Sequence, residues 1–81
     1  MTRVIFHNDQ FHYTKGVKEI SLSVSSYRGL IKELGERYPG LTDAELNAYI
    51  VAVDGVVVPR PFLEKLNPDS EVVFIRKIAA G

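Results

Sequence analysis

The sequence contains no cysteine, and this absence excludes several kinds of chemistry. The chain has no disulfide, no thiolate nucleophile and no cysteine-bound metal, which fits a reducing compartment. The first ten residues lack the apolar core of a signal peptide, and no apolar run approaches the length that spans a membrane. We therefore expect a cytoplasmic protein with no membrane partner.

The sequence also lacks net charge, because ten basic residues balance ten acidic ones. Nucleic acids and anionic membranes attract proteins with a basic excess, so we expect no nucleic-acid partner. The length of 81 residues suffices for one domain, and a composition of 46% hydrophobic and 25% charged residues is typical of a globular chain. We expect a single domain over residues 1–81, with one modest core and little room for an internal active site.

Two segments near the N-terminus have the pattern of β-strands. Residues 3–7, "RVIFH", are rich in β-forming residues. In residues 17–24, "VKEISLSV", apolar and polar side chains alternate, which predicts a strand with one solvent-facing side. The stretch between them, "NDQFHYTKG", is expected to be a long hairpin connection or an extension of both strands.

The C-terminal half predicts three further strands. Residues 48–58, "AYIVAVDGVVV", place Asp54-Gly55 between two valine-rich runs, which is the strongest hairpin signal in the chain. Residues 67–70, "NPDS", predict a turn. Residues 71–78, "EVVFIRKI", form a nearly unbroken apolar run, which predicts a central strand covered on both faces.

One segment has helical spacing with a single apolar stripe. Ser25 or Ser26 is expected to cap its start, and Pro39-Gly40 to end it. A capping-box pattern from Thr42 to Glu45 predicts one further helical turn. The apolar residues of the stripe are Tyr27, Leu30, Ile31, Leu34 and Tyr38.

The order of elements predicts an α+β fold. If the first and last strands lie side by side in the centre, the main helix covers one face of a mixed sheet of four to five strands. This arrangement is the β-grasp, or ubiquitin-like, fold. In it, residues 78–81 form a C-terminal tail directly after the last strand.

The layout resembles that of ubiquitin-like sulfur carriers of the MoaD/ThiS type, the small subunit of molybdopterin synthase and the thiamine sulfur carrier. The resemblance is most specific from Asn47 onward. Val53-Asp54-Gly55 stands where these proteins have a "V-N-G" hairpin turn, and Pro68-Asp69-Ser70 where they have a "D-G-D" turn. Ala80-Gly81 stands where they have a C-terminal Gly-Gly, so the penultimate residue departs from the family pattern.

The resemblance implies a mechanism in which the protein is a carrier and not an enzyme. An E1-like adenylating enzyme uses ATP to activate the Gly81 carboxylate, which then becomes a thiocarboxylate. A sulfur-accepting synthase takes the sulfur into a cofactor precursor, with molybdopterin as the first expectation and thiamine as the next. The carrier itself is expected to bind no cofactor. Two alternatives remain open, a protein modifier joined through Gly81 and a β-grasp binding module without this chemistry.

The residues before Gly81 are expected to form the tail and to dock on the partner. A terminal glycine leaves its carbonyl open to attack and adds no side chain to a narrow channel. Arg76 and Lys77 are either ordinary charges at a strand end or contacts to an acidic groove. Phe62 and Phe74 are candidates for an apolar partner surface, although a second small core is the alternative. The remaining tail residues are Ile78, Ala79 and Ala80.

Other candidate sites are weak. His7, His12 and Asp9 supply too few ligands in a convincing arrangement, so no metal site is expected. Strand alternation and helix capping account for the serines of residues 21–26, so a hydrolase is not expected. The glycine pairs belong to turns, and the domain is not expected to bind ATP itself.

Overall fold

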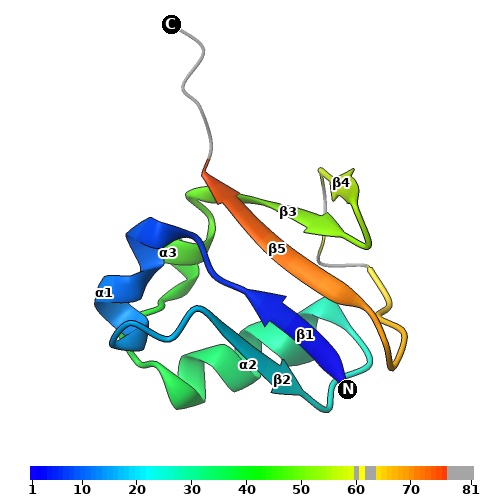
Figure 1. Ribbon diagram of the computed structural model, residues 1–81, viewed down its shortest axis with the longest axis horizontal. Helices are drawn as coiled ribbons and strands as arrows, with labels where there is room; N and C mark the ends of the chain where they lie inside the picture. Colours follow the sequence, from blue (N-terminus) through cyan, green and yellow to red (C-terminus); the bar gives the residue numbers. More distant parts are fainter. Residues whose placement is uncertain (60, 62–63, 77–81) are drawn as a thin grey trace, which may run out of the picture.

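The computed structural model describes residues 1–59, 61 and 64–76, and within this part the chain forms one mixed sheet with helices (Figure 1). The strand order is β2-β1-β5-β3-β4, with β1 and β5 parallel in the centre and the other neighbours antiparallel. This is the β-grasp arrangement that the sequence predicts. The strands are β1 (Thr2–Ile5), β2 (Glu19–Leu22), β3 (Tyr49–Val53), β4 (Val56–Val58) and β5 (Glu71–Arg76). The helical segments are η1 (Asn8–Gln10), α1 (Phe11–Thr14), α2 (Tyr27–Arg37) and α3 (Asp43–Leu46).

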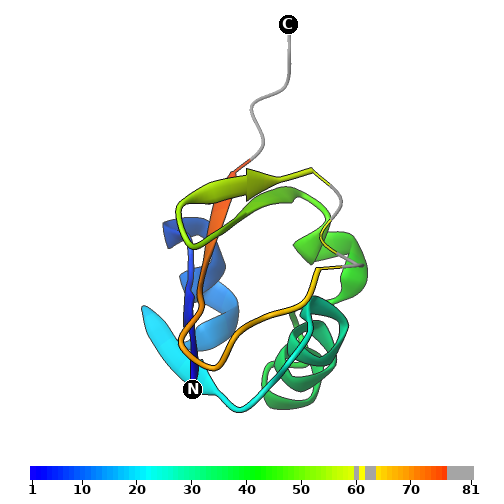
Figure 2. The same ribbon diagram turned by 90° about the vertical axis from the view of Figure 1, so that its right-hand side faces the viewer.

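The main helix, α2, lies against one face of the sheet, and Figure 2 shows the strands and this helix as separate layers. Ser26 is its N-cap, since the Ser26 hydroxyl accepts the backbone N–H of Gly29 at 3.1 Å. Leu30 and Leu34 are completely buried beneath the sheet. Burial of each leucine contributes about 1.5–3 kcal/mol to folding. The apolar stripe therefore packs as its spacing predicts.

The core lies between α2 and the central strands. Val4 of β1 and Val72 of β5 stand next to each other in the register, and both are completely buried. Aromatic rings close the core near the other end of β5, where Phe6 stacks on Phe74 with centroids 6.3 Å apart. Tyr38 meets the Phe6 ring edge-on at 5.8 Å.

The Asp54-Gly55 hairpin forms as predicted. Asp54 has φ 51° and Gly55 has φ 84°, so both central residues take the left-handed conformation of a type I′ turn. The turn before β5 also forms, with the Ser70 N–H donating to the Asn67 carbonyl at 3.0 Å. The two turns contact each other, because the Asp54 carboxylate accepts the Ser70 hydroxyl at 3.2 Å.

The connection between β1 and β2 is a long hairpin connection, which was one of the two predicted forms, and the other, an extension of both strands, is wrong. It forms η1 and α1, and neither strand extends into it. The local cause is a capping box, in which His7 accepts the Asp9 N–H and the Gln10 side chain accepts the His7 N–H. These side chains favour a helical turn over the strand extension that was the alternative. In the loop before β5, Phe62 and Leu63 lie outside the described residues.

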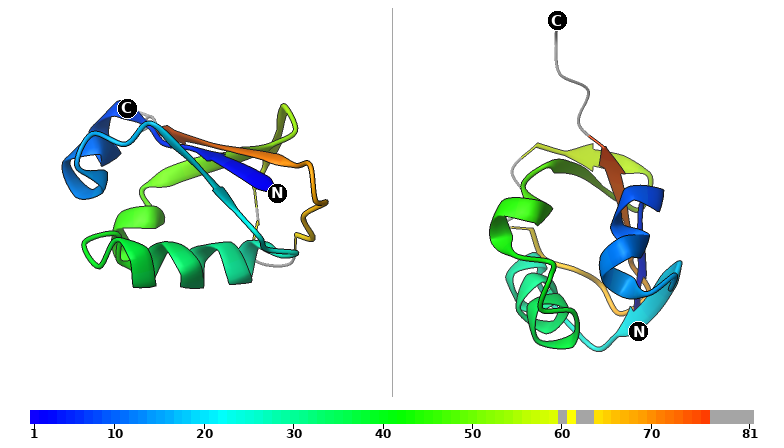
Figure 3. Two further views of the ribbon diagram at one scale, coloured as in Figure 1. Left: turned by 60° about the horizontal axis from the view of Figure 1, so that its bottom comes forward. Right: turned by 90° about the vertical axis from the view of Figure 1, so that its left-hand side faces the viewer.

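The central strand β5 is covered on one face only, which corrects the expectation of two covered faces. Figure 3 shows α2 beneath the sheet and, among the described residues, no helix or strand over the opposite face. Val72 and Phe74 point to the core, whereas Ile75 is 40% exposed. An unbroken apolar run is typical of a doubly covered strand, but here it reflects an apolar surface on the open face.

Candidate functional site

The end of β5 is the part of the described structure nearest in sequence to the expected tail. Arg76 is the last residue of β5 and pairs with Tyr49 of β3 in the register. The backbone of Arg76, at the end of the central strand, is therefore paired with the neighbouring strand β3. The other residues of the expected tail, Lys77, Ile78, Ala79, Ala80 and Gly81, lie outside the described residues.

Arg76 forms an ion pair with Asp9 of η1. The Arg76 side chain is 66% exposed, and the nearby carboxylate raises its pKa. Arg76 is an exposed charge at the end of a strand, as one of the two expectations has it, and its guanidinium is also paired within the protein. The other expectation, a contact to an acidic groove, stays a prediction. Sequence reasoning missed Asp9 as its partner because the two residues stand 67 positions apart.

His7 and Tyr49 complete the surroundings of this ion pair. His7 Nδ1 accepts the Asp9 N–H at 3.1 Å and lies 3.8 Å from an Asp9 carboxylate oxygen. The rings of His7 and Tyr49 have centroids 5.8 Å apart. Partial burial, with a smaller contribution from Asp9, raises the pKa of Tyr49. We call His7, Asp9, Tyr49 and Arg76 the strand-end cluster.

The strand-end cluster does not have the composition of a metal site. Among the described residues, no group of three histidine, cysteine or acidic side chains is placed to hold a metal ion. His7 serves instead as a helix cap, and the His12 ring packs edge-on against Tyr13 at 5.1 Å. Hydrogen bonding and packing therefore account for both histidines.

An apolar surface covers the open side of the sheet. The register aligns Val73 with Ile5 and Ala52, and it aligns Ile75 with Ile50. Because side chains alternate along a strand, all of these share one face. Val57, which pairs with Ala52, extends the surface to the edge strand and is 54% exposed. We call these residues the outer apolar face: Ile5, Ile50, Ala52, Val57, Val73 and Ile75.

Phe74 is not a surface residue, so its assignment to a partner surface is wrong. Its side chain is 2% exposed and packs among Phe6 and Tyr49 in the core. Because nearly every residue of β5 is apolar, the sequence does not show which of its side chains face inward. In the tertiary structure Phe74 faces the core and Ile75 faces outward. Phe62, the other candidate, lies outside the described residues.

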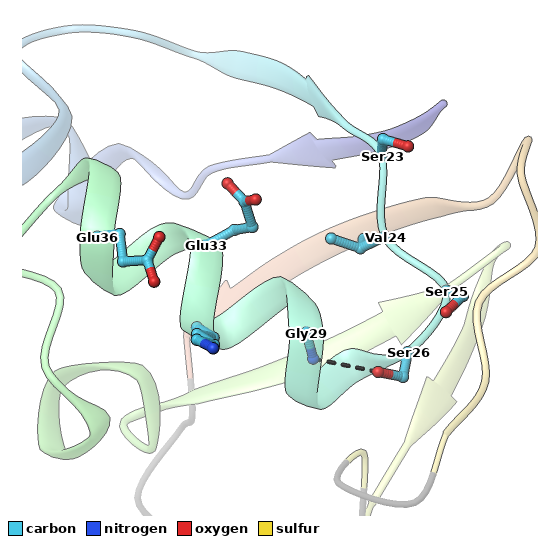
Figure 4. Close-up of a pocket in the computed structure, with 8 residues that line it drawn as sticks. Ser23, Val24, Ser25, Ser26, Gly29, Glu33 and Glu36 are labelled. Carbon is cyan, nitrogen blue, oxygen red and sulfur yellow. Dashed lines mark hydrogen bonds between the residues drawn. The ribbon is translucent and has the colours of Figure 1, made fainter.

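A shallow hollow of about 350 Å³ lies beside the start of α2 (Figure 4). Its lining includes Ser23, Ser25 and Ser26, with Glu33 and Glu36 along the helix. The Ser26 hydroxyl is engaged in capping the helix, as the dashed line in Figure 4 shows. The lining contains no histidine, so it does not form a serine–histidine pair.

The described structure thus defines a class of protein, a β-grasp domain whose central strand ends beside an apolar sheet face. The model of the ThiS family matches residues 4–81, and the chain belongs to that family. Proteins of this family are small sulfur carriers and not enzymes. No curated protein matches the sequence.

Solved structures share the fold at low sequence identity. The crystal structure of the Amycolatopsis orientalis BexX/CysO complex contains a chain with TM-score 0.86 and 16% identity, and the match covers 100% of both chains. The small archaeal modifier protein SAMP1 of Methanosarcina acetivorans gives TM-score 0.78 and 14% identity, with 99% of this chain and 95% of that chain covered. SAMP1 of Haloferax volcanii gives TM-score 0.67 and 13% identity, with 99% and 98% covered.

The helices provide one further observation. None of those in the described ranges is long and apolar enough to cross a lipid bilayer.

Proposed function

We propose that the protein is a sulfur carrier whose Gly81 carboxylate is converted to a thiocarboxylate. The observation that carries this proposal is the family match, which extends through Gly81. The β-grasp fold supports it, because the central strand leads in sequence directly to residues 77–81, which include the expected tail, residues 78–81. In this role the protein supplies the reacting carboxylate, and a partner enzyme supplies the catalytic side chains.

The proposed chemistry has two steps. A Gly81 carboxylate oxygen attacks the α-phosphorus of ATP in an adenylating enzyme, and pyrophosphate leaves. The resulting mixed anhydride is then attacked at its carbonyl carbon by hydrosulfide, which displaces AMP and releases a proton. The thiocarboxylate that forms carries sulfur at the oxidation level of sulfide, so neither step needs an oxidant or a reductant. It then donates its sulfur to a cofactor precursor bound by a synthase.

The outer apolar face is proposed as the surface on which the adenylating enzyme docks. Ile75 lies on this face one residue before Arg76, so an enzyme that takes residues 77–81 into its active site meets Ile75 first. An apolar surface of this kind is typical of a partner contact. The structure of the BexX/CysO complex supports the proposal that β-grasp proteins of this shape act with partner proteins.

Mass spectrometry after incubation with an adenylating enzyme of the same organism, ATP and sulfide tests the proposal. The expected product is heavier by one oxygen-for-sulfur exchange at the C-terminus. A chain lacking Gly81 serves as the control and is expected to remain unchanged. The proposal is overturned if the natural chain gives no such product while an Ala80→Gly variant reacts readily.

A second candidate function is protein modification through Gly81, which the structural similarity to the small archaeal modifier protein of Methanosarcina acetivorans favours. In that case the activated carboxylate acylates a lysine amine and not sulfide. The distinguishing product is a higher-mass conjugate that survives thiol treatment. The identity of the sulfur acceptor, with molybdopterin before thiamine, stays a prediction.

A further inference from the structure

We propose that Asp9 is a positioning residue for the C-terminal tail. It holds Arg76, the last residue of β5, through an ion pair that joins the β1–β2 connection to the end of this strand, and residues 77–81 follow Arg76 in the sequence. This inference rests on the proposed carrier function and assigns part of it to a residue outside the tail. No motif in the sequence marks Asp9 for such a role.

Asp9 is itself held in place by the capping box of η1. Its backbone N–H donates to His7 Nδ1 at 3.1 Å, and the His7 N–H donates to Gln10 Oε1 at 2.8 Å. The Gln10 side chain is completely buried, so it anchors this turn to the body of the domain. The Asp9 carboxylate is therefore presented from a fixed turn and not from a mobile loop.

Arg76 is constrained from two sides. Its main chain pairs with Tyr49 of β3, and its side chain contacts Asp9. The Tyr49 ring packs against Phe74 with centroids 6.3 Å apart, which ties this part of β3 to the core. A residue fixed by both main chain and side chain restricts the direction in which the following peptide starts. That restriction lowers the entropy lost when an enzyme binds the reacting end in one geometry.

Stability is a poor explanation for the ion pair. The two side chains are 66% and 40% exposed, and exposed pairs of this kind contribute little to folding. Charge neutralisation is the remaining alternative. If Asp9 only cancels the charge of Arg76, its removal strengthens attraction to an acidic groove and acts on KM in a salt-dependent way. A positioning role acts instead on the rate at saturating carrier concentration.

The test measures pyrophosphate release by the adenylating enzyme that activates the natural chain, with the carrier concentration varied. Asp9→Asn is expected to lower kcat by about two- to fivefold, because an exposed ion pair holds Arg76 only weakly, with little change in KM, and Asp9→Glu to restore part of the rate. Asp69→Asn is the matched control, because it removes one carboxylate from the turn before β5 and asparagine also suits a turn. Its kcat is expected to equal that of the natural chain.

A double-mutant cycle with Arg76→Gln makes the test specific. If Asp9 acts through Arg76, then Asp9→Asn has no further effect on kcat in the Arg76→Gln background. Thermal unfolding of each variant shows that the domain remains folded. The inference is overturned if Asp9→Asn behaves like Asp69→Asn, or if it changes only KM in a salt-dependent way. If the natural chain releases no pyrophosphate, the proposed function itself is overturned, so the two failures are distinguishable.

Discussion

Asp54 and Glu71 hold each other through two reciprocal contacts between the hairpin turn and the start of the central strand. The Asp54 N–H donates to the Glu71 carbonyl at 2.9 Å, and the Glu71 N–H donates to the Asp54 carboxylate at 2.9 Å. The type I′ turn thus fixes β5 as well as joining β3 to β4. Asp54 combines a left-handed conformation with a hydrogen-bonding side chain, which few residue types provide.

Replacing Asp54 by alanine is expected to lower the free energy of unfolding by about 2–3 kcal/mol. The variant loses the carboxylate contacts to Ser70 and Glu71, and it places alanine at φ 51°. Asp54→Asn keeps an acceptor and tolerates this φ, so its loss is expected to be smaller. Urea unfolding of both variants measures the difference, and equal losses would contradict the role of the side chain.

Alanine substitutions of two glycines, one within α2 and one after its end, are expected to change the free energy of unfolding in opposite directions. A Cβ on Gly40 would lie 2.6 Å from Cδ1 of Tyr13, so Gly40→Ala is expected to cost about 1–3 kcal/mol. A Cβ on Gly35 would meet no heavy atom within 4 Å, so Gly35→Ala is expected to stabilise α2 by about 0.5–1 kcal/mol. If both variants shift the denaturant midpoint in the same direction, the predicted difference in packing between Gly35 and Gly40 is wrong.

Substitutions at two neighbouring residues of β5 are expected to have different effects, one on stability and the other on docking to the adenylating enzyme. Phe74→Ala removes a core side chain that is 2% exposed and is expected to cost about 3–5 kcal/mol in unfolding free energy. Ile75→Ala truncates an exposed side chain and is expected to cost less than about 1 kcal/mol. Under the proposed function, Ile75→Ala raises the KM of the adenylating enzyme for the carrier. An unchanged KM would remove Ile75 from the docking surface.

The domain is expected to lose stability at alkaline pH because of Tyr27. Burial raises the pKa of Tyr27 to about 12, from 10.0 for a free tyrosine. Between these values the unfolded chain releases the phenolic proton while the folded chain keeps it. The stabilisation is therefore complete below pH 10 and is lost as the pH rises toward 12, by about 2–3 kcal/mol.

Denaturant unfolding between pH 9 and pH 12 measures this loss, with Tyr27→Phe as the control. The phenylalanine variant is expected to show a shallower decline. Some decline remains, because a hydrogen bond to Glu45 raises the pKa of Tyr13 and partial burial raises that of Tyr49. Identical slopes for the two proteins would show that Tyr27 is not the main cause.

Ala80, the penultimate residue, is expected to affect the rate of thiocarboxylate formation. Alanine resists backbone conformations with positive φ by about 1 kcal/mol, whereas glycine enters them freely. If the adenylating enzyme holds residue 80 in such a conformation, Ala80→Gly is expected to speed thiocarboxylate formation by about fivefold. Single-turnover mass spectrometry measures the rate. An unchanged rate would show that residue 80 binds in an extended conformation.

The sequence predicted the local elements well because short-range signals define them. Asp54-Gly55 marks a type I′ turn through its preference for positive φ, and Ser26 marks the start of α2 through its hydroxyl. The His7 capping box was equally local, yet histidine is not among the usual N-cap residues. The helical connection between β1 and β2 was therefore missed.

The sequence alone determined the order of the five strands, α2 and α3, the turn chemistry and the amphipathic stripe of α2, because each depends on neighbours a few residues apart. Only the tertiary structure decided which side of β5 faces the core, which makes Phe74 internal and Ile75 external. It also decided that Asp9 meets Arg76. Both outcomes depend on the register between strands and on contacts between distant residues, which no short-range pattern encodes.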